Sequence, residues 1–170
     1  MRHDPDRHHR RSIRLAGYDY NCAGAYYLTI CTHRRGRLFG QIAGQAMLVN
    51  PYGQIVATCW ANLPDHFAHA TVDTFVVMPD HVHGIVILNA TQRQTLPIDT
   101  IGPRGTVQGS LAAVVQNFKS VSSRLINQLR NTPAAPIWQR NYYDHIVRDA
   151  ADMERIRRYI AANPARWRGR

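Results

Sequence analysis

The chain alternates between stretches rich in β-branched and aromatic residues and stretches in which apolar residues recur every three or four positions. The first kind fits strands, because Val, Ile, Thr and Tyr suit a pleated, partly buried surface. The second kind fits amphipathic helices. The pattern predicts strands at residues 26–32, 70–78, 81–88 and 138–148, and helices at residues 50–63, 110–130 and 149–167.

Local signals at the element ends support this assignment. Asn50, Ser110 and Asp149 each precede a helical stretch, and their side chains can accept hydrogen bonds from the free amide groups of a first turn. Asp152 follows Asp149 by three residues, which gives a weak form of the capping box. Pro164 either ends the final helix or bends it.

The order of the elements predicts the fold class. Strand, helix, strand, strand, helix and strand follow one another, and a further helix comes last; residues 44–50 add either a short strand or one arm of a hairpin. The dipeptide Pro-Asp at 79–80 joins two strands in a tight turn. This order indicates an α+β fold: a ferredoxin-like antiparallel sheet with helices on one face plus a C-terminal helix.

We expect a single domain at residues 17–170, preceded by a basic, mobile tail at residues 1–16. Residues 89–109 contain several Gly and Pro residues and no apolar periodicity, so a long loop is expected there, either functional or disordered. No stretch is apolar enough for a membrane span or a signal-peptide core. The cysteines are few and widely spaced, which predicts free thiols and a cytoplasmic location. They are Cys22, Cys31 and Cys59.

The charge of the chain predicts an anionic partner. Lysine and arginine number 21 against 11 acidic residues, for a formal net charge of +10, and only Lys119 is a lysine. A basic surface that neutralises phosphates releases condensed counterions, and each planar guanidinium can bind two phosphate oxygens. These properties favour a nucleic-acid partner, although the base composition of the source genome can produce the same excess of arginine.

Two histidines interrupt the apolar strand at residues 81–88. His81 and His83 are two residues apart, so they point to the same face of a strand. Two imidazole nitrogens at this spacing can bind one divalent cation, with carboxamide or carboxylate oxygens completing the coordination. Alternatively, both histidines are polar members of a half-exposed strand face. The apolar surroundings favour the metal site, because an unpaired buried imidazole is costly.

The final helix can bring a second pair of polar groups to the same place. Tyr159 and Asn163 are four residues apart and share a helical face. Together with the imidazoles they form a set in which Tyr159 is the nucleophile and Asn163 is a third metal ligand through its side-chain oxygen. Spacing alone favours a different role for Tyr159, that of a core aromatic beside Met153, Ile156 and Ile160.

Four sequence blocks together resemble a known family. They read VVMPDHVHGIVIL, SLAAVVQNFKSVSSRLIN, IWQRNYYDHIVRD and RIRRYIAANPARW. In this order they closely resemble the single-tyrosine HUH transposases and, within that group, the REP-associated tyrosine transposases. The segment SIRLAGYDYNCAGAYYLTICTHRRGRLFG is similar to the N-terminal strand region of the same family. The resemblance extends from about Arg11 to Arg166.

The resemblance implies a site and a reaction. His81 and His83 match the histidines that bind the catalytic Mg²⁺ or Mn²⁺, and Tyr159 matches the nucleophile ahead of an Asn-Pro pair. Asn163 matches a third ligand, where relatives carry glutamine. The implied activity is cleavage of single-stranded DNA near hairpins through a 5′-phosphotyrosine, and then strand transfer without a nucleotide cofactor. Such proteins act as monomers or as homodimers in which the tyrosine helix of one chain completes the site of the other.

Other residues are candidates for DNA contact or for support of the site. Basic side chains that can contact phosphate are Arg34, Arg35, Arg37, Arg155, Arg157 and Arg158. Unpaired bases can stack on Tyr142 or Tyr143, whereas core packing is the expected role of Trp138. Asp80 either orients a metal-bound imidazole or forms the turn. His145 is expected to organise the sheet edge near the site.

Two other functions fit parts of the sequence. A ferredoxin-like module that binds DNA or RNA hairpins without cutting them accounts for the charge. The simultaneous presence of both histidines, the tyrosine and the asparagine favours the nuclease over this module. A metal-dependent phosphoesterase acting on small substrates accounts for the histidines, but the net charge and the lack of a phosphate-binding glycine loop disfavour it.

Overall fold

The computed structural model of the chain describes residues 23–90 and 109–169. The predicted tail at residues 1–16 and all but the ends of the predicted loop at residues 89–109 lie outside these ranges. Within the described part, no helix combines the length and the apolar character that crossing a membrane requires. Cys31 and Cys59 are free buried thiols.

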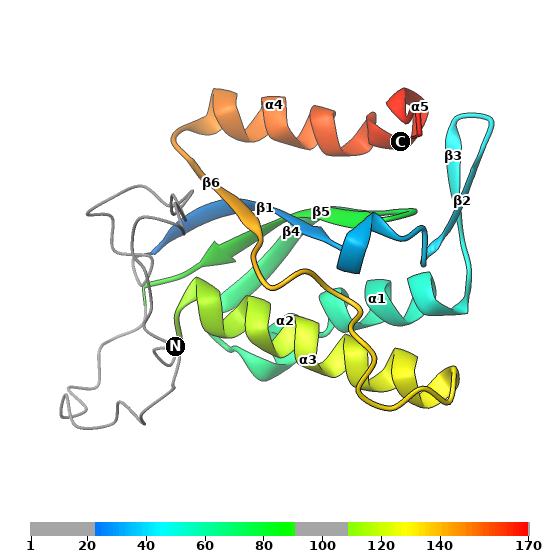
Figure 1. Cartoon of the computed structure of the whole chain (residues 1–170). Coiled ribbons are helices and arrows are strands. Elements are labelled where there is room, and N and C mark those ends of the chain that lie inside the picture. The colour runs from blue at the N-terminus through cyan, green and yellow to red at the C-terminus, as the bar shows by residue number, and fades with distance from the viewer. Residues whose placement is uncertain (1–22, 91–108, 170) are drawn as a thin grey trace, which may run out of the picture.

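A four-stranded antiparallel sheet forms the centre of the molecule (Figure 1). Its strands are β1 (Gly24–Cys31), β4 (Ala70–Met78), β5 (His81–Leu88) and β6 (Tyr143–Val147), in the spatial order β4-β5-β1-β6. One face is covered by α1 (Pro51–Ala61), α2 (Leu63–His66) and α3 (Leu111–Leu129). The other face is crossed by α4 (Ala150–Ala161), which leads into α5 (Asn163–Arg166). The predicted ferredoxin-like class with an additional C-terminal helix is confirmed.

Two small elements follow β1 and lie beside the main sheet. The short 3-10 helix η2 (His33–Arg35) was not predicted. The hairpin of β2 (Gly40–Ala43) and β3 (Ala46–Val49) shows that residues 44–50 form one arm of a hairpin, one of the two predicted alternatives. The predicted helix caps are present: Asn50, Ser110 and Asp149 accept hydrogen bonds from the first turns of α1, α3 and α4.

The predicted strand at residues 138–148 is wrong over its first half. Regular pairing is confined to β6, and Trp138 makes only an isolated bridge to Thr32. The reason is a side chain from α3: the Lys119 ammonium donates to the carbonyls of residues 139, 140 and 141 at 3.0, 3.2 and 3.2 Å. Carbonyls bonded in this way converge on one cation, which a strand ladder does not allow.

The predicted final helix at residues 149–167 is divided at Ala162 into α4 and α5, close to Pro164, where the sequence predicts that the helix ends or bends. Pro164 lies in the first turn of α5, where its missing N–H costs nothing. The break changes the direction of the chain after Ala162, and this change determines where the last residues of the chain lie relative to the sheet.

Strand alternation gives the two faces of the sheet different characters. Val82 and Val86 of β5 point into the large core under α1 and α3. Ile85 points to the opposite face and forms a smaller cluster with Tyr27, Ile156 and Ile160 below α4. His81 and His83 share the face of Ile85, so the histidine pair lies in the layer between the sheet and α4.

Gly84 fixes the histidine strand from the opposite face. A Cβ atom at this position would lie 2.4 Å from a ring carbon of Trp60 and 2.9 Å from a ring carbon of Phe75. These two rings are stacked with centroids 4.6 Å apart, so neither can move away without disturbing the core. The glycine between the second histidine and Ile85 is therefore required by close packing.

Gly84→Ala is expected to lower the free energy of unfolding by about 2–3 kcal/mol, because the added methyl group overpacks the core. Urea unfolding monitored by circular dichroism measures this loss. Gly36→Ala is the matched control, since the nearest atom to its added Cβ is 3.7 Å away and no loss above about 0.5 kcal/mol is expected. Equal stability of the two variants would contradict this explanation.

Candidate active site

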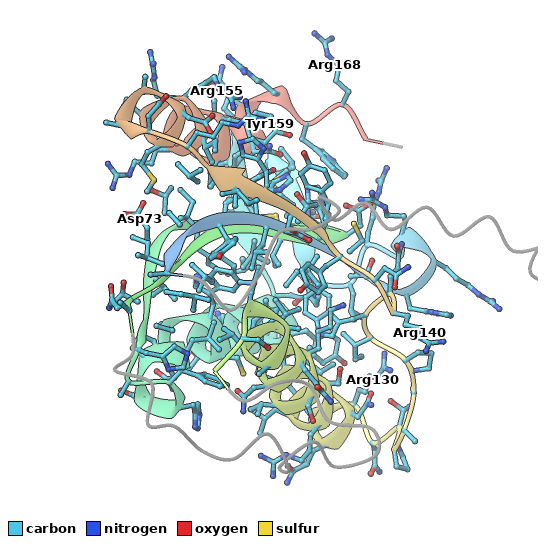
Figure 2. All side chains as sticks on the ribbon, turned by 90° about the vertical axis from the view of Figure 1, so that its left-hand side faces the viewer. Asp73, Arg130, Arg140, Arg155, Tyr159 and Arg168 are labelled. Carbon is cyan, nitrogen blue, oxygen red and sulfur yellow. The ribbon has the colours of Figure 1, made fainter. Side chains whose placement is uncertain are left out.

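A cavity of about 780 Å³ opens between the sheet and the C-terminal helices. It is lined by His81 and His83 from β5, Tyr159 from α4 and Asn163 from α5. The four residues that the sequence proposes for chemistry therefore meet at one place, although they come from three different elements. Figure 2 shows Tyr159 on the α4 side of the sheet, with Arg155 beside it and Arg168 farther out.

The two imidazoles are oriented toward each other. Their Nε2 atoms are 3.0 Å apart, and the residues are only 6% and 5% exposed. The Nδ1 atom of His81 lies 2.5 Å from a carboxylate oxygen of Asp80. The Nδ1 atom of His83 lies 2.7 Å from the Tyr27 hydroxyl and 2.9 Å from the Thr29 hydroxyl. Because the Nδ1 atom of each histidine has a partner, each ring is held with its Nε2 atom facing the other ring.

The sheet register and the β4–β5 turn supply these partners. Thr29 is directly opposite His83 in the β1–β5 ladder, and Tyr27 lies two residues away on the same face. Asp80 ends the turn before β5 and is 2% exposed, so it both forms the turn and holds the His81 ring. The turn-forming role predicted for Asp80 is therefore confirmed, and its carboxylate also contacts the His81 ring.

Burial dominates the electrostatics of the pair. Desolvation, followed by the nearby His81 and Arg35, lowers the pKa of His83 to about 3, so this imidazole is neutral at physiological pH. A neutral imidazole has a free lone pair for a metal ion. Burial raises the pKa of the Tyr27 phenol; a hydrogen bond from Thr29 opposes the rise, and Tyr159 adds to it. Tyr27 is therefore a neutral hydroxyl partner for His83.

The donor set fits a divalent cation bound by nitrogen and amide oxygen. In residues 23–90 and 109–169, no group of three or more His, Cys, Asp or Glu side chains is arranged to hold a metal ion. A third protein ligand beside the two imidazoles therefore has to be another polar group. Asn163 provides a carboxamide in the same cavity, at the first residue of α5. Two imidazoles with an oxygen ligand suit Mn²⁺ and related ions.

Tyr159 is exposed toward the cavity and is not a core residue. It is 42% exposed, whereas its helical neighbours Ile156 and Ile160 are 3% and 0% exposed and anchor α4 on the sheet. Its ring centroid lies 5.5 Å from that of His83 and 6.1 Å from that of Tyr27. The alternative role of Tyr159 as a core aromatic is therefore wrong.

Polar side-chain contacts fasten α4 at both edges of the sheet. At one edge, Arg157 donates two hydrogen bonds to Asp73 of β4, at 2.9 and 2.7 Å. Asp73 lies where the β4–β5 register shifts between residues 72 and 75. At the other edge, His145 of β6 lies 2.8 Å from Asp152 of α4. His145 thus has the sheet-edge role expected for it, and Arg157 is part of the fold.

The arginines expected to contact phosphate divide into two groups. Arg35 and Arg155 line the cavity. Arg34, Arg37 and Arg158 are not among its lining residues, and Arg158 instead lies 3.8 Å from Glu154 on the exposed side of α4.

The aromatic residues considered for base stacking or core packing also differ in position. Tyr143 is 44% exposed and lines the cavity. Tyr142 packs under the Lys119 ammonium, which lies 5.3 Å from its ring centroid. Trp138 is in the core as predicted, with its indole N–H donating to Ser122.

Sequence reasoning missed the last residues of the described chain. Arg166, Trp167 and Arg168 line the cavity together with Asn163. The alternation of basic and aromatic residues directly after the Asn-Pro pair is the signal that was available. It carried no weight because the expected end or bend at Pro164 did not show where the following residues would lie.

Comparison with known proteins gives one close sequence relative. An uncharacterized protein of Haemophilus influenzae (strain ATCC 51907 / DSM 11121 / KW20 / Rd) is 39% identical over 166 residues, which cover 94% of this chain and 91% of the relative. The chain belongs to the same family as this Haemophilus protein. No protein-family model matches the sequence.

Two solved structures with the same fold are described as transposases. A REP-associated tyrosine transposase bound to a REP hairpin has a TM-score of 0.59 and 18% identity, covering 89% of this chain and 72% of that one. A candidate transposase from Deinococcus radiodurans R1 has a TM-score of 0.50 and 17% identity, covering 87% of this chain and 95% of that one. At these identities the likeness establishes the shared fold.

Arg157→Gln is expected to loosen α4 at neutral pH, because it removes the ion pair with Asp73. Arg157 holds the pKa of Asp73 well below its usual value of 3.8, so the pair stabilises the fold above that value and is lost as the pH falls below it. Hydrogen exchange of α4 amides should be faster in the variant at neutral pH and similar to wild type in acid. Arg158→Gln, on the exposed side of α4, is the control and should leave exchange unchanged; faster exchange in both variants would contradict the specific role of Arg157.

Proposed function

We propose that the chain is a transposase of the single-tyrosine HUH type, a metal-dependent endonuclease and strand transferase that acts on single-stranded DNA beside hairpins. The observation that carries the proposal is the position of Tyr159 next to a buried pair of imidazoles, of which His83 is held neutral, in a cavity rimmed by arginines. The shared fold with a REP-associated tyrosine transposase bound to a REP hairpin supports it. The net charge of +10 supports a DNA partner.

In the proposed reaction, Tyr159 is the nucleophile. Its phenolic oxygen forms a bond to the phosphorus of the DNA backbone while the bond from phosphorus to the 3′ oxygen breaks. The phenol loses its proton and the departing 3′ oxygen takes one up, which leaves a 5′-phosphotyrosine and a free 3′-hydroxyl. The ester retains the energy of the broken bond, so attack by the 3′-hydroxyl of another strand reverses the step and joins the strands. No nucleotide cofactor is needed.

His81, His83 and Asn163 would hold the Mg²⁺ or Mn²⁺ ion. A bound divalent cation would polarise a phosphate oxygen and orient the scissile bond. Asp80 would fix the ring of His81 through its carboxylate, and the hydroxyl of Tyr27 would do the same for His83. These contacts leave both Nε2 atoms available to the ion.

Arginines around the cavity would bind the DNA backbone. Arg35 and Arg155 lie at its rim, and the described lining residues include no Asp or Glu. A phosphate in the cavity would therefore meet positive charge on several sides. All four proposed site residues line a cavity of a single chain, so a homodimer is not required to bring them together. A cytoplasmic, DNA-associated enzyme fits this activity.

The protein is expected to form a covalent adduct with single-stranded hairpin DNA from the flanks of its own gene when Mn²⁺ or Mg²⁺ is present. Tyr159→Phe and His81→Ala should each abolish the adduct, because they remove the nucleophile and a metal ligand. Denaturing electrophoresis of labelled oligonucleotides measures it.

Tyr143→Phe is the matched control for this assay, since Tyr143 is another exposed tyrosine of the same cavity. An adduct that survives in Tyr159→Phe and disappears in Tyr143→Phe would move the nucleophile to residue 143. Tight, salt-sensitive hairpin binding without any adduct would overturn the enzyme in favour of a hairpin-binding module.

Asp80→Asn is expected to weaken Mn²⁺ binding by about 10- to 100-fold, because the carboxylate that orients His81 is lost while the shape of the turn is kept. Isothermal titration of the purified variant measures the affinity, and thermal unfolding checks that the fold is intact. Asp65→Asn, at an exposed position of α2, is the control. Unchanged Mn²⁺ affinity in Asp80→Asn would remove Asp80 from the metal site.

A further inference from the structure

We propose that Trp167 is a binding residue for one unpaired nucleobase of the single-stranded DNA, held next to the phosphate that Tyr159 attacks. The inference rests on the proposed function and deepens it, since it names a contact to a base in a site otherwise described by contacts to phosphate. It starts from the position of Trp167 relative to the histidine pair.

Trp167 lies against His81. The centroids of the indole and imidazole rings are 5.6 Å apart, and the planes are inclined by 37°. Its backbone is extended after the end of α5, and its N–H donates to the carbonyl of Pro164 at 3.2 Å. Helix α5 ends at Arg166, and Trp167 is the extended residue directly after it, with its side chain lining the cavity.

Core packing does not explain this tryptophan. Trp60 and Trp138 are 2% and 8% exposed, and both belong to the large core under α1 and α3. Trp167 is only partly buried and belongs to neither hydrophobic cluster of the described residues. Its one ring contact there is with His81. A partly exposed indole at the mouth of an arginine-lined cavity is available for contact with a ligand.

The residues on either side of Trp167 match the chemistry of a nucleotide. Arg166 and Arg168 line the same cavity and can pair with the phosphates before and after a stacked base. Aromatic rings alternating with basic side chains are the general means by which proteins bind single strands, because every base offers a π-face. A flexible single strand can present a base to the indole, whereas a paired base inside a duplex cannot.

A base held at Trp167 would determine which phosphate is cut. The indole lies beside His81, and Tyr159 lies beside His83, so the tryptophan and the nucleophile are on adjoining parts of the histidine pair. Stacking would therefore set the register of the strand in the cavity and bring one phosphodiester bond to Tyr159. Trp167 would act only in binding the strand and setting its register. The Tyr159 hydroxyl and the two imidazoles would act in the reaction itself.

The fluorescence of Trp167 tests the inference directly. The probe is a hairpin oligonucleotide with a single-stranded thymidine arm, compared with the same hairpin carrying an abasic arm of equal length and charge. The intact protein, kept without divalent metal, should be quenched by the thymidine arm and much less by the abasic arm. Trp60 and Trp138 are buried, so the signal should disappear in Trp167→Phe, which keeps a ring for stacking.

Affinity provides the second readout. Trp167→Ala should weaken binding of the thymidine arm by roughly 5- to 150-fold and leave binding of the abasic arm nearly unchanged. Trp167→Phe should recover most of the loss, and Trp167→Leu should not. If Trp167→Ala weakens both arms equally, or if the wild-type protein binds both arms equally, the inference is overturned.

Covalent adduct formation, measured in parallel, separates this inference from the proposed function. An adduct together with equal binding of both arms overturns the role of Trp167 and leaves the enzyme standing. Base-dependent quenching without any adduct supports the role of Trp167 and overturns the enzyme. Equal quenching by a ribonucleotide arm that binds more tightly than the DNA arm would overturn the assignment to DNA.

Discussion

The docking of α4 across the open face of the sheet is the constraint on which the candidate site depends. Arg157 binds Asp73 on β4, and Asp152 binds His145 on β6, so the helix is fixed at both outer strands. Apolar contacts are non-directional and would tolerate some sliding or rotation of a helix, whereas two directional polar contacts at opposite edges define its position. Tyr159, two residues after Arg157, consequently has a defined place beside the histidine pair.

The histidine pair depends in turn on the geometry of antiparallel strands. Alternation brings His81 and His83 to one face, and the β1–β5 register places Thr29 directly opposite the second of them. The β4–β5 turn places Asp80 beside the first. Each outer nitrogen thereby gains a partner, and the inner nitrogens are left facing one another. Burial keeps His83 neutral, so the pair avoids the cost of two adjacent buried charges.

Local patterns predict most of the fold, because alternation, helical spacing and capping residues all act within a few positions of the chain. Features that join distant residues were not predicted. Lys119 of α3 binds three carbonyls about twenty positions later, and this contact shortens the predicted strand at residues 138–148. The bond from Arg157 to Asp73 spans 84 positions. The place of Trp167 in the cavity was not predicted for another reason: the sequence indicates an end or a bend at Pro164 but not where the residues after it lie.

The two faces of the sheet differ in composition. One face packs on the large apolar core, and the other carries the arginines of the candidate site, which suit an anionic ligand. Gly84 and its neighbours in the large core hold β5 from below with apolar contacts, while the opposite face carries polar groups beside the smaller apolar cluster under α4. On that face the described residues lining the cavity include Arg35, Arg155, Arg166 and Arg168 and no acidic side chain. Part of this positive charge is balanced within the protein, because Arg155 pairs with Asp152 and Arg35 lies 4.0 Å from Asp80. The charge that these carboxylates leave unbalanced favours an anionic ligand, which fits the nucleic-acid partner proposed above.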